Sequence, residues 1–257
     1  MINHGLAGKV AFVTGVSRRA GIGAAIARAL AGAGADVFTT YYRPYDELMP
    51  WGNHAIEAED IVKGLREEGV RAEGMEADLA DPDVPARVFA HVRASFGFVD
   101  ILVNNAVCDI GADVYGLSAA SIDRHYAVNV RAAMLLCAEF AKCHDGRGGG
   151  RIINMSSGQG ADPMPDNLPY AATKGAVEAF TLSLSASLAG KGVTVNAIDP
   201  GPTDSGWLTD DLRSELLRRA PFGRIGTPGD AAKLVLHLAS SEAQWITGQL
   251  IRSRGGL

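Results

Sequence analysis

The chain has 257 residues and a formal net charge of −5, and 47% of its residues are hydrophobic. This apolar fraction is ample for a large core and excludes an intrinsically disordered chain. The acidic balance argues against a nucleic-acid-binding surface, which is normally basic.

The sequence shows no pattern typical of a membrane-spanning helix, a signal peptide or a cysteine metal site. No apolar run reaches the length of a membrane-spanning helix, and the first residues lack a charged-then-apolar signal pattern. The three cysteines do not have metal-ligand spacing. We therefore expect a cytoplasmic protein with reduced thiols, with no metal site and with neither nucleic acid nor membrane as a partner.

Apolar runs and helical patterns alternate along the chain. Short apolar runs predict strands at 10–13, 36–41, 70–75, 99–103, 150–155 and 193–198. Helical composition is found between and after them at 22–33, 54–68, 84–96, 118–144 and 168–188. This alternation implies right-handed crossovers and a parallel sheet covered by helices on both faces. Because no repeat or linker divides the chain, we expect one α/β domain over residues 1–257.

Four segments fall at the carboxyl ends of the predicted strands, where such sheets carry their chemistry. The glycine-rich residues 14–23 offer backbone amides and a helix N-terminus to a pyrophosphate. Residues 104–106, Asn-Asn-Ala, either fix a loop beside a ligand or form an ordinary turn. Residues 154–157 place serine hydroxyls after the fifth strand, and residues 199–203 form a rigid turn after the sixth.

The helix predicted at 168–188 carries Tyr170 and Lys174. Residues four apart share a helix face, so an ammonium is expected beside a phenol. A nearby cation favours the phenolate and lowers the pKa of a tyrosine, which then exchanges protons near neutral pH. A pair with this spacing is by itself most often a solvated helix face, and it gains meaning only from the segments before it.

Together these residues resemble the short-chain dehydrogenase/reductase family, in its single-domain branch, over nearly the whole chain. The matching motifs are, in order, Thr14-Gly15, Gly21-x-Gly23, Asn104-Asn105-Ala106, Asn129, Ser157, Tyr170, Lys174 and Pro200-Gly201. Within the family the chain looks most like the 3-oxoacyl-[acyl-carrier-protein] reductases, which residues 222–228 resemble. The resemblance implies a Rossmann-type doubly wound parallel sheet of about seven strands. It also implies NAD(P)-dependent hydride transfer between the nicotinamide and a carbonyl or secondary alcohol.

The resemblance also implies roles for individual residues. Tyr170 is the implied general acid or base, and Lys174 lowers its pKa and binds the nicotinamide ribose. Ser157 is implied to polarise the substrate oxygen, with Ser156 as the alternative. Asn129 is implied to hold a relay water near the lysine; it can at the same time be a buried asparagine bonded to backbone. The implied cofactor contacts are Gly15, Ser17, Arg18, Arg19, Gly21, Ile22, Tyr42, Asp78, Leu79, Asn105, Ala106, Tyr170, Lys174, Pro200, Gly201 and Thr203.

Cofactor choice depends on the residue at the end of the second strand. NAD-preferring relatives usually carry an aspartate there, which binds the ribose 2′-hydroxyl, whereas this chain has Tyr41. Arg18 and Arg19 in the glycine loop are suited to gripping a phosphate. We expect NADP(H) as cofactor, with NAD(H) as the alternative.

Three features depart from the family pattern. The glycine loop is longer, with Arg19 and Ala20 as the inserted pair, and Val107 replaces the usual glycine after the Asn-Asn-Ala motif. Residues 43–54 are an unusually long connection, which either covers the adenosine end of the cofactor or forms a surface loop.

Substrate identity is the least defined part of the prediction. The expected lining is residues 107–114, 159–165 and 205–221. Residues 204–208 have the mixed composition of a mobile lid. Arg213, Arg218 and Arg219 either meet an acidic carrier protein or form a solvated helix face.

Other functions stay open at this point. They are an NAD-dependent dehydrogenase of a sugar, steroid or other small alcohol, and a catalytically silent nucleotide-binding regulator. Enoyl reduction is disfavoured, because enoyl reductases typically separate the tyrosine and lysine more widely. By resemblance we also expect a homotetramer, formed through the helices at 118–144 and 168–190 and through the C-terminal strand.

Overall fold

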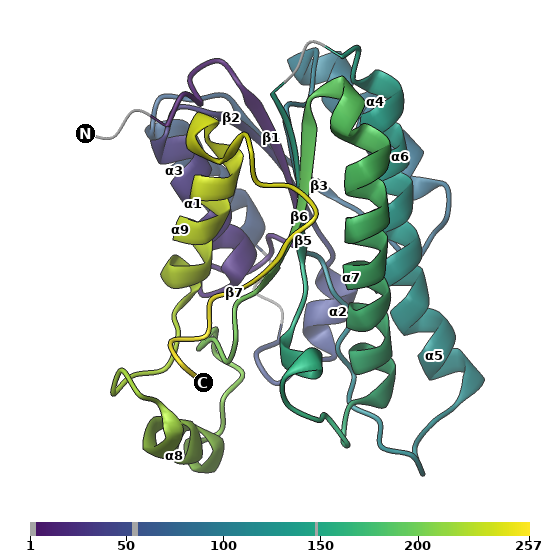
Figure 1. Ribbon diagram of the computed structural model, residues 1–257, viewed down its shortest axis with the longest axis vertical. Coiled ribbons are helices and arrows are strands. Elements are labelled where there is room, and N and C mark those ends of the chain that lie inside the picture. The colour runs from purple at the N-terminus through teal and green to yellow at the C-terminus, as the bar shows by residue number, and fades with distance from the viewer. Residues whose placement is uncertain (1–3, 53–55, 147–148) are drawn as a thin grey trace.

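Strands and helices alternate in the computed structural model, which describes residues 4–52, 56–146 and 149–257 (Figure 1). The strands are β1 (Val10–Thr14), β2 (Asp36–Tyr41), β3 (Ala72–Glu76), β4 (Ile101–Asn104), β5 (Gly150–Met155), β6 (Val193–Asp199) and β7 (Leu250–Arg252). The helices are α1 (Ile22–Gly32), α2 (Arg43–Glu47), α3 (Glu57–Glu67), α4 (Val84–Phe96), α5 (Ala119–Tyr126), α6 (Ala133–Cys143), α7 (Leu168–Leu188), α8 (Asp210–Arg219) and α9 (Pro228–Ala239).

The seven strands form one parallel sheet in the order β3-β2-β1-β4-β5-β6-β7. The predicted doubly wound, seven-stranded α/β fold is therefore confirmed. The chain winds outward in one direction from β1 to β3 and in the other from β4 to β7. Because the winding reverses between β1 and β4, a crevice is expected at their carboxyl ends, where ligands bind in such sheets.

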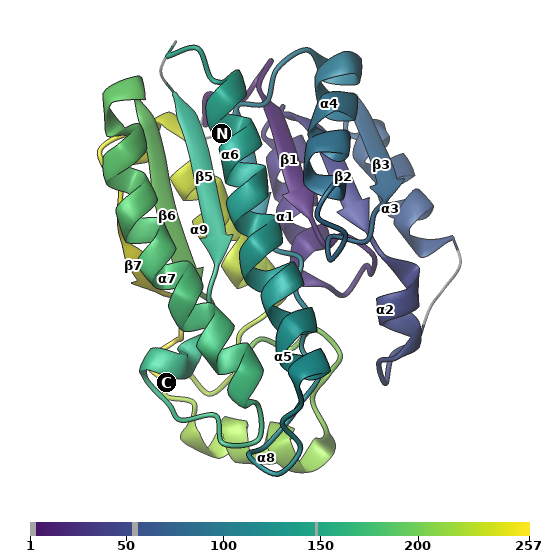
Figure 2. The ribbon, with the colours of Figure 1, turned by 90° about the vertical axis from the view of Figure 1, so that its right-hand side faces the viewer.

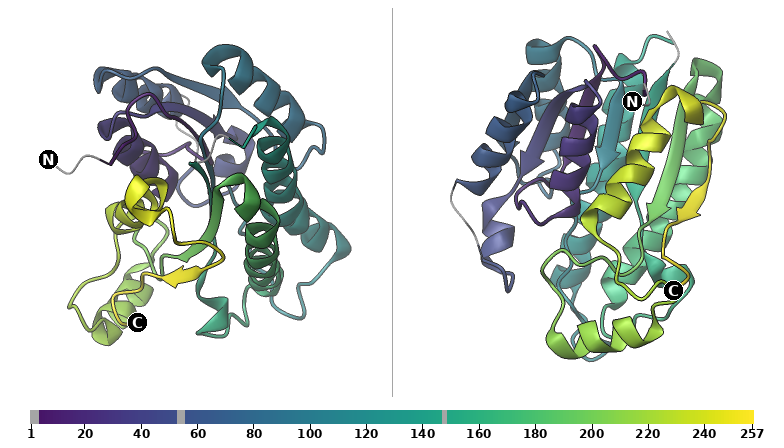
Figure 3. Two further views of the ribbon diagram at one scale, coloured as in Figure 1. Left: turned by 45° about the horizontal axis from the view of Figure 1, so that its top comes forward. Right: turned by 90° about the vertical axis from the view of Figure 1, so that its left-hand side faces the viewer.

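Each face of the sheet is covered by its own helices and holds its own core. α1, α3 and α9 pack on one face with side chains such as Val13 and Ile26, and α4, α6 and α7 pack on the other with Phe12 and Phe140. Alternate residues of β1 thus enter opposite cores, as the period of a strand requires. The right-hand view of Figure 3 shows α1 and α9 side by side on the first face.

The predicted helix at 118–144 is interrupted in the structure. α5 is followed by a π-helical segment, Ala127–Ala132, and only then by α6. An added residue in a helical turn is rare and is frequently found at functional sites. Hydrophobic period alone does not reveal such an insertion, so the prediction of one continuous α-helix was wrong here.

Other differences concern helix and strand limits. α8 and α9 lie in a region where we predicted no helix, although α9 carries a capping box made by Thr227 and Asp230. β4 begins at Ile101 rather than at residue 99, and the side chain of Asp100, just before it, accepts hydrogen bonds from Lys9 and from the backbone of Val10. The first two residues of the helix predicted at 54–68 lie outside the described residues.

Several elements gather at the carboxyl edge of the sheet. α2 follows β2 there, and α8 and the N-terminal ends of α5 and α7 lie at the same end of the molecule (Figure 2). Among the described helices none is long and apolar enough to cross a membrane.

Candidate active site

Tyr170 and Lys174 lie on the first turns of α7, which begins with Pro169 near its N-terminus. The Lys174 ammonium is 5.3 Å from the centre of the Tyr170 ring and donates a hydrogen bond of 2.8 Å to the carbonyl of Met155, the last residue of β5. Lys174 is only 5% exposed. The predicted pairing on one helix face is therefore present, and it is anchored to the carboxyl end of a central strand.

The pKa values of this pair differ from the expectation. Burial raises the pKa of Tyr170, and the carboxylates of Asp109 and Asp199 raise it further, while a hydrogen bond with Ser157 works in the opposite direction. Burial also lowers the pKa of Lys174 to about 8. The prediction that the ammonium lowers the tyrosine pKa was wrong for this structure, because loss of water around the buried phenol has the largest effect and raises the pKa.

The two adjacent serines have different partners. The Ser156 hydroxyl donates to Glu178 Oε1 at 2.6 Å, as does the side-chain amide of Gln159. Ser157 is the serine that hydrogen-bonds Tyr170. Of the two candidates, the structure thus brings Ser157 to the tyrosine and directs Ser156 toward α7.

Asn129 lies in the π-helical segment and is buried. Its side-chain oxygen accepts from the Cys108 amide at 2.7 Å, and its side-chain nitrogen donates to the Cys108 carbonyl at 2.9 Å and to Thr173 Oγ1 at 3.0 Å. Asn129 therefore ties the loop after β4 to α7, immediately beside Lys174, and is a buried asparagine bonded to backbone.

The glycine loop is packed closely against the loop after β4. Gly15 has a φ of +74°, and a Cβ there would lie 2.7 Å from Cα of Ala106. A Cβ on Gly23 would lie 2.4 Å from the carbonyl oxygen of Gly15. The Asn105 side chain donates to the carbonyls of Thr14 and Gly15 at 2.9 and 3.0 Å. Of the two alternatives for residues 104–106, a loop-fixing role thus agrees with the structure, since Asn105 holds the glycine loop.

The start of α1 fits an anionic ligand. Its N-cap is Gly21, which has no side chain to satisfy the free amides, and Ile22 begins a first turn without acidic residues. A helix N-terminus of this kind favours phosphate. The glycine loop and this helix end therefore suit the pyrophosphate of a dinucleotide.

The two loop arginines point to different places. Arg19 pairs with Asp60 of α3 at 2.7 Å, and its backbone amide donates to Glu57. Arg18 instead donates to the carbonyl of Ser205, at 2.9 Å, in the segment after β6. Of these two arginines, Arg18 connects the glycine loop with the segment after β6, and Arg19 connects it with α3.

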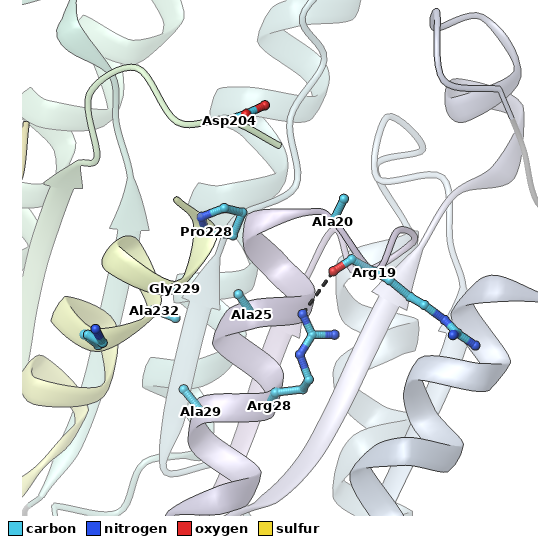
Figure 4. Close-up of a pocket in the computed structure, with 10 residues that line it drawn as sticks. Arg19, Ala20, Ala25, Arg28, Ala29, Asp204, Pro228, Gly229 and Ala232 are labelled. Carbon is cyan, nitrogen blue, oxygen red and sulfur yellow. Dashed lines mark hydrogen bonds between the residues drawn. The ribbon is translucent and has the colours of Figure 1, made fainter. Parts of the chain in front are cut away.

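Arg19 also borders a groove of about 530 Å³ between α1 and α9 (Figure 4). The groove has alanines on its floor, Ala25 and Ala29 among them, and the Arg28 guanidinium donates to the Arg19 carbonyl at 3.0 Å. None of the residues proposed for catalysis lines this groove.

The long connection 43–54 is packed against the site as far as it is described. α2 occupies its first residues, the Tyr45 hydroxyl accepts from the Asp109 amide at 3.1 Å, and Trp51 stacks on Arg18. Residues 43–52 therefore pack against the glycine loop and the loop after β4, and their covering of the adenosine end stays a prediction. Residues 53 and 54 lie outside the described part of the chain.

The residues near the end of β2 have charged neighbours. β2 ends at Tyr41, as expected. Tyr42 hydrogen-bonds Asp78, whose carboxylate also accepts from Arg124 at 3.1 Å. Leu79 beside it is buried.

The turn after β6 holds the last group of predicted cofactor residues. The buried Asp199 accepts from the Gly201 amide at 2.9 Å, which shapes the turn at Pro200. Thr203 donates to the Gly201 carbonyl at 3.1 Å and is only 4% exposed. Ser17, Arg18 and the remaining cofactor candidates thus border the same carboxyl edge, whereas the Arg19 side chain is directed to α3.

Sequence reasoning missed two charged residues at the carboxyl edge of the sheet, Asp109 near Tyr170 and Arg254 near Asp199. Asp109 acts on the pKa values of both Tyr170 and Lys174 and accepts a hydrogen bond from Asn167. Arg254, in the C-terminal segment, pairs with Asp162 and lies 3.8 Å from Asp199. Neither belongs to a motif, and Arg254 reaches the site only through contacts that span about a third of the chain.

Known proteins resemble the chain over nearly its full length. The family profile described as enoyl-(acyl carrier protein) reductase matches residues 15–257. An uncharacterized oxidoreductase of Bacillus subtilis (strain 168), YjdA, is 46% identical over 250 residues, which cover 96% of each chain.

Solved structures give the same result. A short chain dehydrogenase from Burkholderia cenocepacia J2315 in complex with NADP is 34% identical, with a TM-score of 0.87 and 98% of both chains covered. The angucycline C-6 ketoreductase LanV with bound NADP is also 34% identical, with a TM-score of 0.87, and 98% of this chain and 96% of that chain are covered. The chain therefore belongs to the short-chain dehydrogenase/reductase family of NAD(P)-dependent oxidoreductases, which act on carbonyl and alcohol groups.

Proposed function

We propose that this protein is an NADP(H)-dependent reductase of a ketone carbonyl, which also oxidises the corresponding secondary alcohol. The observation that carries the proposal is the convergence of Tyr170, Lys174, Ser157 and Asn129 at the carboxyl edge of the sheet. This group lies beside a glycine loop suited to a pyrophosphate. When bound, the nicotinamide cofactor supplies the hydride for reduction and accepts it for oxidation.

Tyr170 is the proposed general acid. Its raised pKa keeps the phenol protonated at neutral pH, so it has a proton to give to the carbonyl oxygen during reduction. The Ser157 hydroxyl, which bonds the same phenol, donates to that oxygen and stabilises the negative charge that develops on it. Both groups therefore act on one substrate atom.

Lys174 and Asn129 support this pair. The pKa of about 8 leaves Lys174 largely protonated at neutral pH, and its ammonium is the proposed donor to the nicotinamide ribose hydroxyls. Asn129 holds the loop at Cys108 against α7, which fixes the position of Lys174 relative to the rest of the site.

NADP(H) is proposed as the cofactor because of the charges at the end of β2. A small cavity between the glycine loop and β2 is lined by both Arg18 and Arg43, and relatives of known structure hold NADP. The same cavity is bordered by Asp46 and Glu57, which is why NAD(H) stays the alternative. The proposed contacts are those predicted from the sequence, with Arg18 rather than Arg19 facing the phosphate.

A free ketone is the proposed substrate, and a 3-oxoacyl thioester is the second candidate. The segment 222–228, which suggested an acyl-carrier reductase, serves to start α9, since Thr227 caps this helix and Arg224 pairs with Asp230. Arg213 is paired with Asp204, which reduces the positive charge available to an acidic carrier protein. The resemblance to the ketoreductase LanV also favours a ketone.

The proposal is tested by following oxidation of NADPH and of NADH with a panel of ketones, enones and one 3-oxoacyl thioester. We expect turnover of ketones with NADPH, and at least a thousandfold loss of turnover in Tyr170→Phe with cofactor binding retained. Reduction of an enone C=C bond would instead support enoyl reduction. Tight cofactor binding without any turnover would support a silent regulator.

We further propose that the protein is a cytoplasmic homotetramer.

A further inference from the structure

Arg18 is held in place by a segment that this chain adds after β2. We call residues 43–52 the strap. The Arg18 guanidinium carbon lies 3.8 Å from the centre of the Trp51 ring, and the Trp51 indole N–H donates to Asp46 Oδ1 at 3.0 Å. The same Asp46 oxygen is 3.9 Å from Arg18 Nε. The three side chains thus form a closed triangle, in which each contacts the other two.

This triangle is largely shielded from water. The Arg18 side chain is 17% exposed and that of Asp46 is 7% exposed. The Arg18 guanidinium also donates to the carbonyl of Ser205 in the segment after β6. An arginine with a stacked face, a paired carboxylate and a carbonyl acceptor keeps one orientation, so little side-chain entropy is lost when it binds an anion.

The orientation of Arg18 matters because of the cavity it borders. Ser17, Arg18, Tyr41, Arg43 and Asp46 line a small cavity between the glycine loop and the end of β2. The end of the second strand is where this class of sheet places the 2′ position of the adenosine ribose. The cavity therefore lies where the 2′-phosphate that distinguishes NADP(H) from NAD(H) would be recognised.

We propose that Trp51, together with Asp46, is a positioning residue that fixes Arg18 for the 2′-phosphate, so that the strap helps to set the preference for NADP(H). Trp51 acts through Arg18 and does not touch the reacting atoms. This inference rests on the proposed function, because it assumes that Arg18 faces the cofactor phosphate.

The test is isothermal titration of NADPH and of NADH into wild-type protein and variants. Trp51→Leu removes the stacked ring and should weaken NADPH binding about tenfold, while NADH binding changes about twofold or less. Trp51→Phe keeps an aromatic face and should recover most of the loss. Trp245→Leu is the matched control, because Trp245 is 94% exposed, and it should bind both cofactors as the wild type does. In turnover, Trp51→Leu should raise KM for NADPH and leave kcat unchanged.

A double-mutant cycle with Arg18→Met separates positioning from a general effect on folding. If Trp51 acts through Arg18, the variant Trp51→Leu/Arg18→Met binds NADPH no more weakly than Arg18→Met alone. Additive losses, or an equal loss for NADPH and NADH, would overturn the inference. A wild-type protein that binds NADH as tightly as NADPH would instead overturn the NADP(H) proposal, and one that binds neither would overturn the proposed function.

Discussion

Replacing each of the two adjacent serines by alanine separates an effect on turnover from an effect on stability. Ser157 bonds the Tyr170 phenol, whereas the Ser156 hydroxyl is 2.6 Å from Glu178 Oε1. We expect Ser157→Ala to lose turnover and keep its stability. We expect Ser156→Ala to lose stability and keep its turnover.

The magnitudes follow from the partners. Removing a donor to the developing oxyanion typically lowers kcat by about a hundredfold to a thousandfold, and we expect this range for Ser157→Ala. Ser156 is only 4% exposed, and its hydrogen bond is to an ionisable carboxylate. Its loss should lower the free energy of unfolding by about 1.5–3 kcal/mol. Glu178 keeps the Gln159 amide as a partner, which places the expected cost at the lower end.

The assay compares kcat and KM for NADPH-dependent ketone reduction with urea unfolding curves for the two alanine variants and the wild type. Ser157→Ala should share the wild-type unfolding midpoint within error and bind NADPH normally. If Ser156→Ala lost as much turnover as Ser157→Ala while both remained folded, the assignment of Ser157 would be refuted. Ser157→Thr, which retains a hydroxyl, should recover part of the activity.

Three further expectations concern other parts of the molecule. Gly23→Ala should lower the free energy of unfolding by about 1–3 kcal/mol, because its Cβ would meet the Gly15 carbonyl. Gly64 in α3 has open space around it, so Gly64→Ala should raise the free energy of unfolding by about 0.5–1 kcal/mol in the same urea assay. Equal effects of the two substitutions would contradict this account. The pKa of about 8 for buried Lys174 lies below that of an unfolded lysine, so between about pH 8 and pH 10 the unfolded chain binds one proton more than the folded chain. The free energy of unfolding should therefore rise with pH in this range, by up to about 3 kcal/mol. Urea unfolding curves of Lys174→Met should lack this rise. Light scattering should give a tetramer that Leu182→Glu dissociates, because Leu182 on α7 is 63% exposed, and a monomeric wild type would refute the homotetramer.

Much of the fold was predictable from local pattern. Short apolar runs separated by helical segments specify a parallel α/β sheet, because buried parallel strands and their crossover helices have different periods. The spacing of Tyr170 and Lys174 likewise specified one helix face, since helical geometry is set by the backbone. The interruption of the helix near Asn129 was not predictable, because an inserted residue leaves the hydrophobic pattern nearly unchanged.

The pKa of Tyr170 illustrates what a motif does not contain. Its spacing from Lys174 predicted a lowered pKa, and the structure has a raised one, since burial raises the pKa most and two carboxylates raise it further. Burial depends on how α7 packs on the sheet, while Asp109 comes from the loop after β4 and Asp199 is the last residue of β6. The direction of the shift therefore depends on residues that no local window includes.

The sequence by itself determined the alternation of the first six strands with their crossover helices, the glycine loop after β1 and the shared face of Tyr170 and Lys174. Only the tertiary structure decided that Ser157 rather than Ser156 meets the tyrosine, that Arg18 stacks on Trp51 and that Arg254 reaches Asp199. The physical reason is the range of the interactions. Backbone geometry and hydrophobic period involve residues that are close in sequence, so they can be read from a short segment. Side chains that meet across the carboxyl edge come from distant parts of the chain and contact one another only after the whole sheet has formed.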